Sequence, residues 1–252
     1  MTTTFIGVDL AWQSDKNHSG IAVLRGDSSG ATLFSCSANI ATLQGVVNYI
    51  LANATANTVV AIDAPLIIKN AGGQRPCEKL ISQKFGRYHA SAHTSNLTRY
   101  PDAGSIQVAQ LLEQNGFSHT PNPTTDKYKE GRWLFEVYPH PAQVVLFDLE
   151  KIIKYKKGRI ADKRAGLEIL RHYIKTKFGQ GRPPLRPNDL FEELLNQDFD
   201  RLKGKALKHY EDILDALVCA YLALYYWRWG AEKAEMIGNL ETGYIINPTE
   251  VL

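Results

Sequence analysis

The segment Phe5-Ile6-Gly7-Val8-Asp9-Leu10-Ala11-Trp12 contains one acidic residue within an otherwise apolar, β-forming run. Such a run predicts a strand, here over residues 4 to 11. An ionised carboxylate in apolar surroundings requires a cation, a strong hydrogen-bond donor or a proton. Asp9 therefore indicates a functional site at the same place where the sequence predicts the first strand of the fold.

A second apolar run with a single acid, Val59-Val60-Ala61-Ile62-Asp63-Ala64, predicts a strand buried on both faces. Pro65 ends it, because proline has no N–H to continue the ladder. Between the two runs, apolar residues at helical spacing predict a helix over 41 to 53. The other expected elements are strands near 19 to 25, 31 to 37 and 133 to 138, a helix that has Pro141 in its first turn, and helices near 162 to 178, 187 to 203 and 207 to 228.

This order of elements predicts an α/β fold of the RNase H-like class. We expect a mixed five-stranded sheet flanked by helices, with the first strand at the centre beside the fourth. Residues 1 to 252 are expected to form one domain, since no linker or repeat divides them. Residues 66 to 132 are polar, with helix-like stretches near 76 to 86 and 104 to 116. They are expected to form a helical insertion, or lid, after the fourth strand.

Three more carboxylates belong to this pattern. Glu136 lies in the strand-like run that starts at residue 133. Asp212 and Asp215 lie about 60° apart on one helix face, Asp215 toward the sheet and Asp212 nearer the rim. Because Mg²⁺ and Mn²⁺ prefer oxygen ligands, Asp9, Asp63 and Asp215 are the predicted metal ligands. Asp212 and Glu136 are further candidate catalytic residues.

Each acid also has a structural explanation. A single Asp at a strand end is more often a turn or cap residue than a ligand. Asp212 alone is typical of a solvated helix face, and Glu136 could pair with a buried Arg or Lys instead. The case for a metal site depends on Asp9, Asp63 and Asp215 occurring together.

Basic residues at two places suit contacts with phosphate groups. Seven lysines and arginines fall within residues 151 to 164, opposed by one acid. In the insertion, cations alternate with tyrosines, which suits a nucleotide or a single strand. A solvated lysine face, a polar lid and a turn histidine are the structural alternatives. The candidate substrate-binding residues are Arg75, Arg87, His140, Lys156, Lys157 and Lys163.

The composition is that of an ordinary globular protein. The 252 residues are 44% hydrophobic with a formal net charge of +3, which permits a phosphate-bearing partner without requiring one. Three scattered cysteines suit a reducing compartment, so we expect a cytoplasmic protein. No membrane association is expected, because the opening residues lack a secretory pattern and the apolar stretch 213 to 227 is too short to span a bilayer.

Four motifs resemble a known family. GVDLAW, AIDAPL, EVYPHPA and EDILDALVCA, spread over nearly the whole chain, are similar to the bacterial and archaeal family called domain of unknown function 429, predicted RNase H-like nucleases. The pair Asp212 and Asp215 also resembles the final helix of Holliday-junction resolvases. The resemblance implies a two-metal centre bridged by Asp9. Residues 41 to 53 hold no acid, unlike the matching helix of RNase H, which favours the resolvase arrangement.

These residues are consistent with three functions. The first is a metal-dependent nuclease that hydrolyses phosphodiester bonds of DNA or RNA with Mg²⁺ or Mn²⁺. The second is a nucleotide-binding phosphotransferase or ATPase of the same superfamily, against which Trp12 argues, because a bulky side chain keeps the backbone from a triphosphate. The third is a non-catalytic nucleic-acid-binding module, which predicts scattered carboxylates rather than carboxylates at strand ends.

Overall fold

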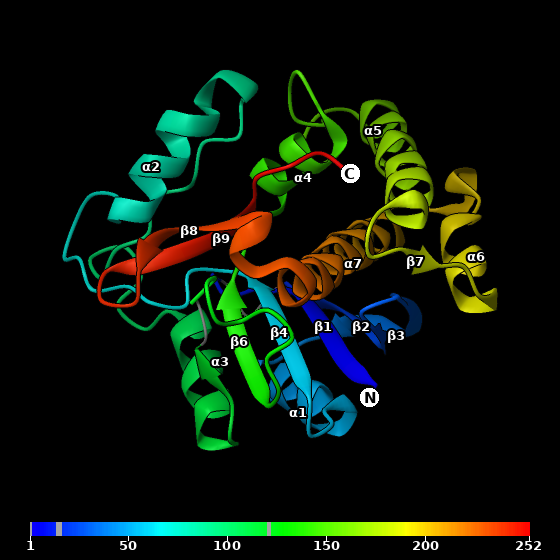
Figure 1. Cartoon of the computed structure of the whole chain (residues 1–252). Helices are drawn as coiled ribbons and strands as arrows, with labels where there is room; N and C mark the ends of the chain where they lie inside the picture. Colours follow the sequence, from blue (N-terminus) through cyan, green and yellow to red (C-terminus); the bar gives the residue numbers. More distant parts are fainter. Residues whose placement is uncertain (1, 14–16, 120–121) are drawn as a thin grey trace.

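Strand β1 (Thr3–Asp9) lies inside a mixed sheet, between β4 (Thr58–Asp63), which is parallel to it, and β2 (Ser19–Asp27), which is antiparallel. The computed structural model describes residues 2–13, 17–119 and 122–252. In this part of the chain the sheet has seven strands in the order β5-β6-β4-β1-β2-β3-β7 (Figure 1). The other strands are β3 (Gly30–Ile40), β5 (Ser118–His119), β6 (Arg132–Glu136) and β7 (Leu185–Arg186).

The prediction of a mixed α/β fold is confirmed, but the predicted number of five strands is wrong. The two additional strands, β5 and β7, lie at the edges and have two residues each, too short to produce an alternating pattern. A separate antiparallel hairpin, β8 (Ala234–Asn239) and β9 (Gly243–Pro248), was also missed. Each of its two strands has only a short apolar run in the sequence.

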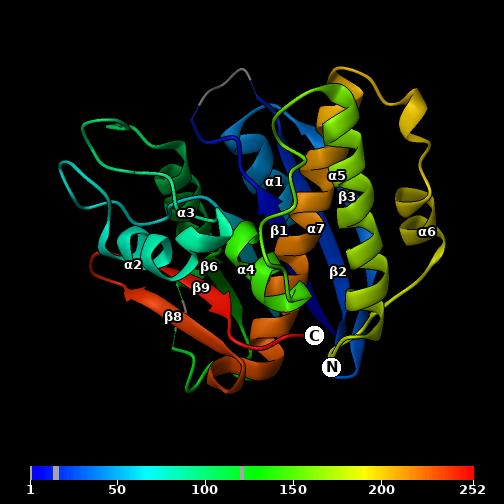
Figure 2. The same cartoon turned by 90° about the horizontal axis from the view of Figure 1, so that it is seen from above.

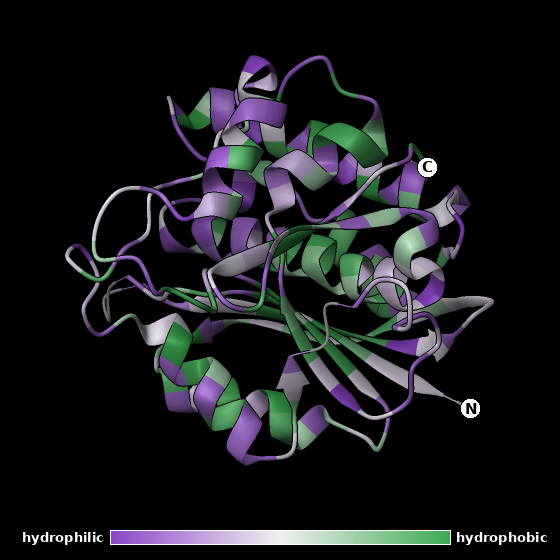
Figure 3. Ribbon diagram, turned by 60° about the vertical axis from the view of Figure 1, so that its left-hand side comes forward, coloured by the Kyte–Doolittle hydropathy of each residue, from purple (hydrophilic) through white to green (hydrophobic). Residues whose placement is uncertain are grey.

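Helices cover both faces of the sheet (Figures 1 and 2). One face is covered by α1 (Leu43–Asn53) and α3 (Gly104–Gln114), whose apolar residues share a core with β1, β2 and β4. The long helix α7 (Lys205–Trp229) covers the other face. Figure 3 shows the hydrophobic strands between these two layers. The remaining helices are α2 (Pro76–Phe85), α4 (Pro139–Phe147), α5 (Ile160–Tyr173), which continues as a π-helix to Phe178, and α6 (Asp189–Leu195).

The alternation of side chains along the strands decides which acids can meet. In β1, Ile6 and Val8 face α1 and α3, whereas Phe5 belongs to the core under α7. Side chains alternate with period two, so Asp9 is on the same side as Phe5, toward α7. The register pairs Asp9 with Asp63 on β4. Both aspartates therefore lie under α7 at the carboxyl ends of adjacent parallel strands.

Two glycines bring α7 directly onto the strands. A Cβ on Gly7 would lie 2.0 Å from the backbone oxygen of Ala216, and one on Gly20 would lie 2.3 Å from that of Asp212. Real side chains do not approach this closely, so the helix backbone rests on the sheet. Because Gly20 is the β2 partner of Asp9, the first turns of α7 are held over the end of β1.

Residues 66 to 132, apart from residues 120–121 outside the described part, lie in two places. Helix α2 packs on the β8–β9 hairpin through Cys77, Ile81 and Phe85. Helix α3 packs beside α1, and β5 extends the sheet. Only the first half of this segment, residues 66 to 103, borders the site described below.

Candidate functional site

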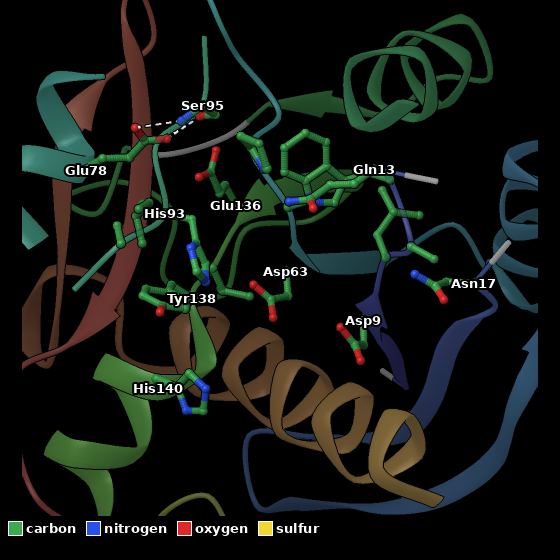
Figure 4. Close-up of a pocket in the computed structure, with 18 of the residues that line it drawn as sticks. Asp9, Gln13, Asn17, Asp63, Glu78, His93, Ser95, Glu136, Tyr138 and His140 are labelled. Carbon is green, nitrogen blue, oxygen red and sulfur yellow. Dashed lines mark hydrogen bonds between the residues drawn. The ribbon is translucent and has the colours of Figure 1, made fainter. Parts of the chain in front are cut away.

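Asp9 and Asp63 are the centre of the candidate site. Figure 4 shows both carboxylates pointing into one cavity from neighbouring strands. The cavity has a volume of about 300 Å³ and lies at the carboxyl ends of β1, β4 and β6, where α/β sheets commonly bind ligands. The predicted convergence of these two acids is what the strand register produces.

Helix α7 supplies two aspartates with different surroundings. Asp212 lines the cavity, shares a hydrogen bond with the Asp9 carboxyl, and accepts a hydrogen bond from Lys208 Nζ. Asp215, one turn later, is 0% exposed and does not line the cavity. Its Oδ1 accepts a hydrogen bond of 2.7 Å from the Tyr155 hydroxyl, and its Oδ2 lies 2.9 Å from Lys156 Nζ. Asp212 is thus nearer to Asp9 than the rim position expected for it.

Lys156 lies among the carboxylates instead of on an outer basic face. Its side chain is 32% exposed, and its ammonium group makes an ion pair with Asp215. Burial raises the pKa of both Asp9 and Asp63, and the charge of Lys156 opposes this rise at each, which places it within electrostatic reach of both. The sequence grouped Lys156 with its exposed neighbours, because a run of lysines does not show which one turns inward.

Glu136 makes a different contact from the aspartates. The register pairs Glu136 with Ile62, so its side chain leaves the sheet on the side opposite to Asp63. There it accepts hydrogen bonds of 2.6 and 2.9 Å from the Arg75 guanidinium and one of 2.9 Å from the backbone of Leu66. Glu136 has the buried arginine partner that was the structural alternative for it.

Arg75 is buried and holds two acids. It is 2% exposed, donates from Nε to Glu78 Oε1 at 2.8 Å, and donates from Nη1 to the Ile67 carbonyl at 3.0 Å. Glu78 in turn accepts hydrogen bonds from Ser95 (Figure 4). Although Arg75 lines the cavity, its donors are engaged by protein groups. It ties residues 66 to 95 to the end of β6.

The other candidate substrate-binding residues lie apart from the carboxylates, with one exception. His140 lines the cavity beside Tyr138 and Tyr155, and its Nδ1 has no hydrogen-bond partner in the described part of the chain. Burial and the nearby charge of Lys156 lower the pKa of His140 to about 4, which keeps it neutral. Arg87 stacks on Tyr88 at the surface, Lys157 is exposed, and Lys163 lies on α5 outside the cavity.

The sequence did not identify several of the residues that line the cavity. His93, Ser95, Tyr138 and Lys208 line the cavity, and Tyr155 stands behind it. Lys208 lies one helical turn before Asp212, a spacing that predicts an ion pair. The others come from loops, where no periodic signal shows which side chain turns inward. Trp12, considered only as an obstacle to a triphosphate, lines the cavity and packs edgewise on Tyr100.

The crowded carboxylates are difficult to ionise together. Burial raises the pKa of Asp9 and Asp63, with Lys156 opposing and neighbouring aspartates adding to the effect. Burial and the charge of Asp9 raise the pKa of Asp212 to about 8. At neutral pH the pair Asp9 and Asp212 therefore holds a proton between two carboxyl groups.

We expect stability to fall as the pH rises from about 4 to 8 in chelator. The unfolded chain releases the Asp212 proton near the ordinary aspartate pKa of about 4, whereas the folded chain keeps it until about pH 8. The extra proton stabilises the fold at low pH, and this contribution is lost through the interval. Urea unfolding at pH 5 and 8 should show a loss roughly 2–4 kcal/mol smaller in Asp212→Asn than in the wild type. Equal losses in both proteins would contradict the raised pKa.

The carboxylate oxygens of this site suit a hard cation, but in this structure they contact lysines and a proton instead. As they are now placed, no three His, Cys, Asp or Glu side chains of the described ranges could hold a metal ion, so the aspartates would have to turn from their present partners to bind one. Lys156, Lys208 and a shared proton now offset part of the charge of the carboxylates. Of the charged side chains that line the cavity, five are carboxylates and three are cationic. This excess of negative charge favours binding of a cation.

Comparison with known proteins identifies the family. The family model described as "Protein of unknown function (DUF429)" matches residues 7–239. The chain therefore belongs to this family, as its four motifs suggested. No curated protein and no solved structure gave a match. Among the described residues, no helix combines the length and apolarity needed to cross a membrane.

Proposed function

We propose that this protein is a metal-dependent nuclease that hydrolyses phosphodiester bonds. One observation carries the proposal: Asp9 and Asp63 end adjacent parallel strands, and α7 brings Asp212 over them at an open cavity. Acids gathered in this way, with raised pKa values and excess negative charge, are typical of sites that bind a divalent cation.

An RNase H-like fold is part of the proposal. The five central strands follow the order β3-β2-β1-β4-β6, with β1, β4 and β6 parallel and β2 antiparallel to β1. This is the order expected for that fold, with the first strand central and its aspartate beside the fourth strand. Helix α7 contributes the later acids, as in the resolvase arrangement that the motifs resemble.

The side chains that would hold Mg²⁺ or Mn²⁺ are Asp9, Asp63 and Asp212. Such an ion would supply activation of a water molecule and stabilisation of the leaving oxygen. Neutral His140, on the cavity wall, is suited to accept or donate a hydrogen bond to water or to a phosphate oxygen. The exposed Lys157 and Arg87 could contact the backbone of a DNA or RNA partner outside the cavity.

The two alternative functions are less well supported. A phosphotransferase or ATPase needs backbone close to the phosphates, and Trp12 fills the cavity wall that follows β1. A non-catalytic nucleic-acid-binding module would not need carboxylates whose pKa values are raised in a shared cavity. We also propose a cytoplasmic location, with which the three free cysteines agree.

The proposal is tested by incubating the full chain with labelled single-stranded, duplex and branched DNA and RNA. We expect cleavage of at least one substrate with Mg²⁺ or Mn²⁺ and none in chelator, since the negative cavity cannot accept a phosphate without a cation. Restored cleavage after adding back Mn²⁺ would separate metal removal from unfolding. Cleavage that continues in chelator, or no cleavage of any substrate with either ion, would refute it.

A further inference from the structure

The loop between α4 and α5 delivers Tyr155 and Lys156 into the centre of the carboxylate cluster. Helix α5 rests on this loop, because a Cβ on Gly166 would lie 2.1 Å from the Lys154 carbonyl oxygen and 3.0 Å from the Tyr155 Cα. The buried Tyr155 hydroxyl accepts a 3.2 Å hydrogen bond from Gln143 Nε2 and donates to Asp215. The backbone immediately before Lys156 is thus fixed by packing from α5 and by the hydrogen bonds of Tyr155.

Each carboxylate oxygen of Asp215 contacts one of these two residues. Tyr155 satisfies Oδ1, and the ammonium of Lys156 lies 2.9 Å from Oδ2. Since Asp215 is 0% exposed and does not line the cavity, a metal ion could reach it only by displacing Lys156. The predicted ligand set of Asp9, Asp63 and Asp215 is therefore divided between the open cavity and an interior ion pair.

The two lysines of the site differ in how they are held. Lys208 pairs with Asp212 from the surface, and its side chain is 52% exposed, so solvent can replace it. Lys156, whose side chain is 32% exposed, pairs with the buried Asp215 and acts on Asp9, Asp63 and Asp215 together. Lys208 also pairs with the buried Glu211, so its charge is divided between Asp212 and Glu211. Lys156 thus supplies the fixed positive charge beside Asp9, Asp63 and Asp215.

We propose that Lys156 is a built-in cation that takes the place of a second divalent ion, so that Asp9, Asp63 and Asp212 hold a single metal ion. Asp215 then positions the ammonium of Lys156 and does not bind metal. This inference rests on the proposed function and replaces its two-metal form by a site with one metal and one lysine. In this arrangement Lys156 is a positioning residue. Its positive charge stays in the site when metal is removed.

Manganese binding to the full chain tests the inference. We titrate Mn²⁺ into the wild type, Lys156→Met and Lys157→Met, and count bound ions by electron paramagnetic resonance. We expect one ion with an uncoupled spectrum in the wild type and in Lys157→Met, the exposed neighbour that serves as control. In Lys156→Met we expect two ions with an exchange-coupled spectrum, because removal of the ammonium opens Asp215 to a second ion.

A purely structural role for Lys156 predicts a different result. In that case Lys156→Met would bind one ion, like the wild type, and Mn²⁺ would not raise its melting temperature more than that of Lys157→Met. That result, or two ions in the wild type, would overturn the inference while the proposed function stands. Failure of all three proteins to bind Mn²⁺ would instead refute the proposed function. If Lys156→Met does not fold, the wild-type count and Lys156→Arg, expected to bind one ion, still decide.

Discussion

Replacement of Asp9 by Asn should reduce metal-dependent cleavage by roughly a thousandfold or more. Asn keeps the shape of the side chain and removes the charge that lies between Asp63 and Asp212 at the end of β1. Without that charge the cavity loses the carboxylate most central to cation binding. Cleavage of the most reactive substrate, measured with Mg²⁺ under single-turnover conditions, gives the size of the loss.

Stability should not decrease in the same variant. The pKa of Asp9 is raised by burial and by Asp215, so its ionised form is a cost to the metal-free fold, and an amide relieves it. Thermal melting in chelator should give a midpoint equal to or above that of the wild type. Asp27→Asn, at the exposed end of β2 and away from the cavity, is the control for cleavage and should not change it. Asp9→Asn that melts well below the wild type, or that cleaves at the wild-type rate, would remove Asp9 from the proposed site.

Replacement of Arg75 by Met should lower the free energy of unfolding by about 3–5 kcal/mol. Met fills most of the volume, but Glu136 and Glu78 lose their shared guanidinium in a region where both are almost fully buried. An unpaired buried carboxylate must either take up a proton or draw water into the fold. Chemical denaturation at pH 7 measures the loss.

Lys84→Met is the control for Arg75→Met. Lys84 lies in α2, the helix that begins directly after Arg75, and pairs with Glu235 at 2.6 Å, but its side chain is 48% exposed. Exposed pairs of this kind contribute less than about 1 kcal/mol. Similar losses of unfolding free energy in the two variants would show that burial does not increase the contribution of the Arg75 ion pairs to stability.

The two strand-end aspartates could be predicted from the sequence because a strand has a period of two. Asp9 and Asp63 each follow an apolar run with the same spacing from its buried residues, so pairing of the strands in register places them side by side. The same period argues against Glu136, which falls on the other face once β6 pairs with β4. Its face depends on the register between β4 and β6, two strands far apart in the sequence, which sequence alone does not fix.

The parts that sequence could not predict depend on contacts across the chain. Nothing near Lys156 distinguishes it from its neighbours until α5 presses the loop inward at Gly166. Arg75 looked like a surface cation because its partner Glu136 is 61 residues away. The edge strands β5 and β7 exist only because neighbouring strands offer free backbone groups, and they have too few residues to show a pattern. Local periodicity indicates the elements, whereas distant partners decide which side chains serve the site.

Because α7 packs directly on Gly7 and Gly20, the carboxylate cluster cannot form until late in protein synthesis. The two halves of the carboxylate cluster, around residues 9 and 212, leave the ribosome far apart in time, since translation adds about 5–20 residues per second. Until residues 205 to 229 have emerged, the buried face of β1 and β2 has no cover and the acids of α7 are missing. A nascent chain therefore lacks the carboxylate cluster for most of its synthesis. The last long helix both closes the core and completes this cluster. Non-local assembly of this kind folds slowly and leaves apolar strands exposed meanwhile.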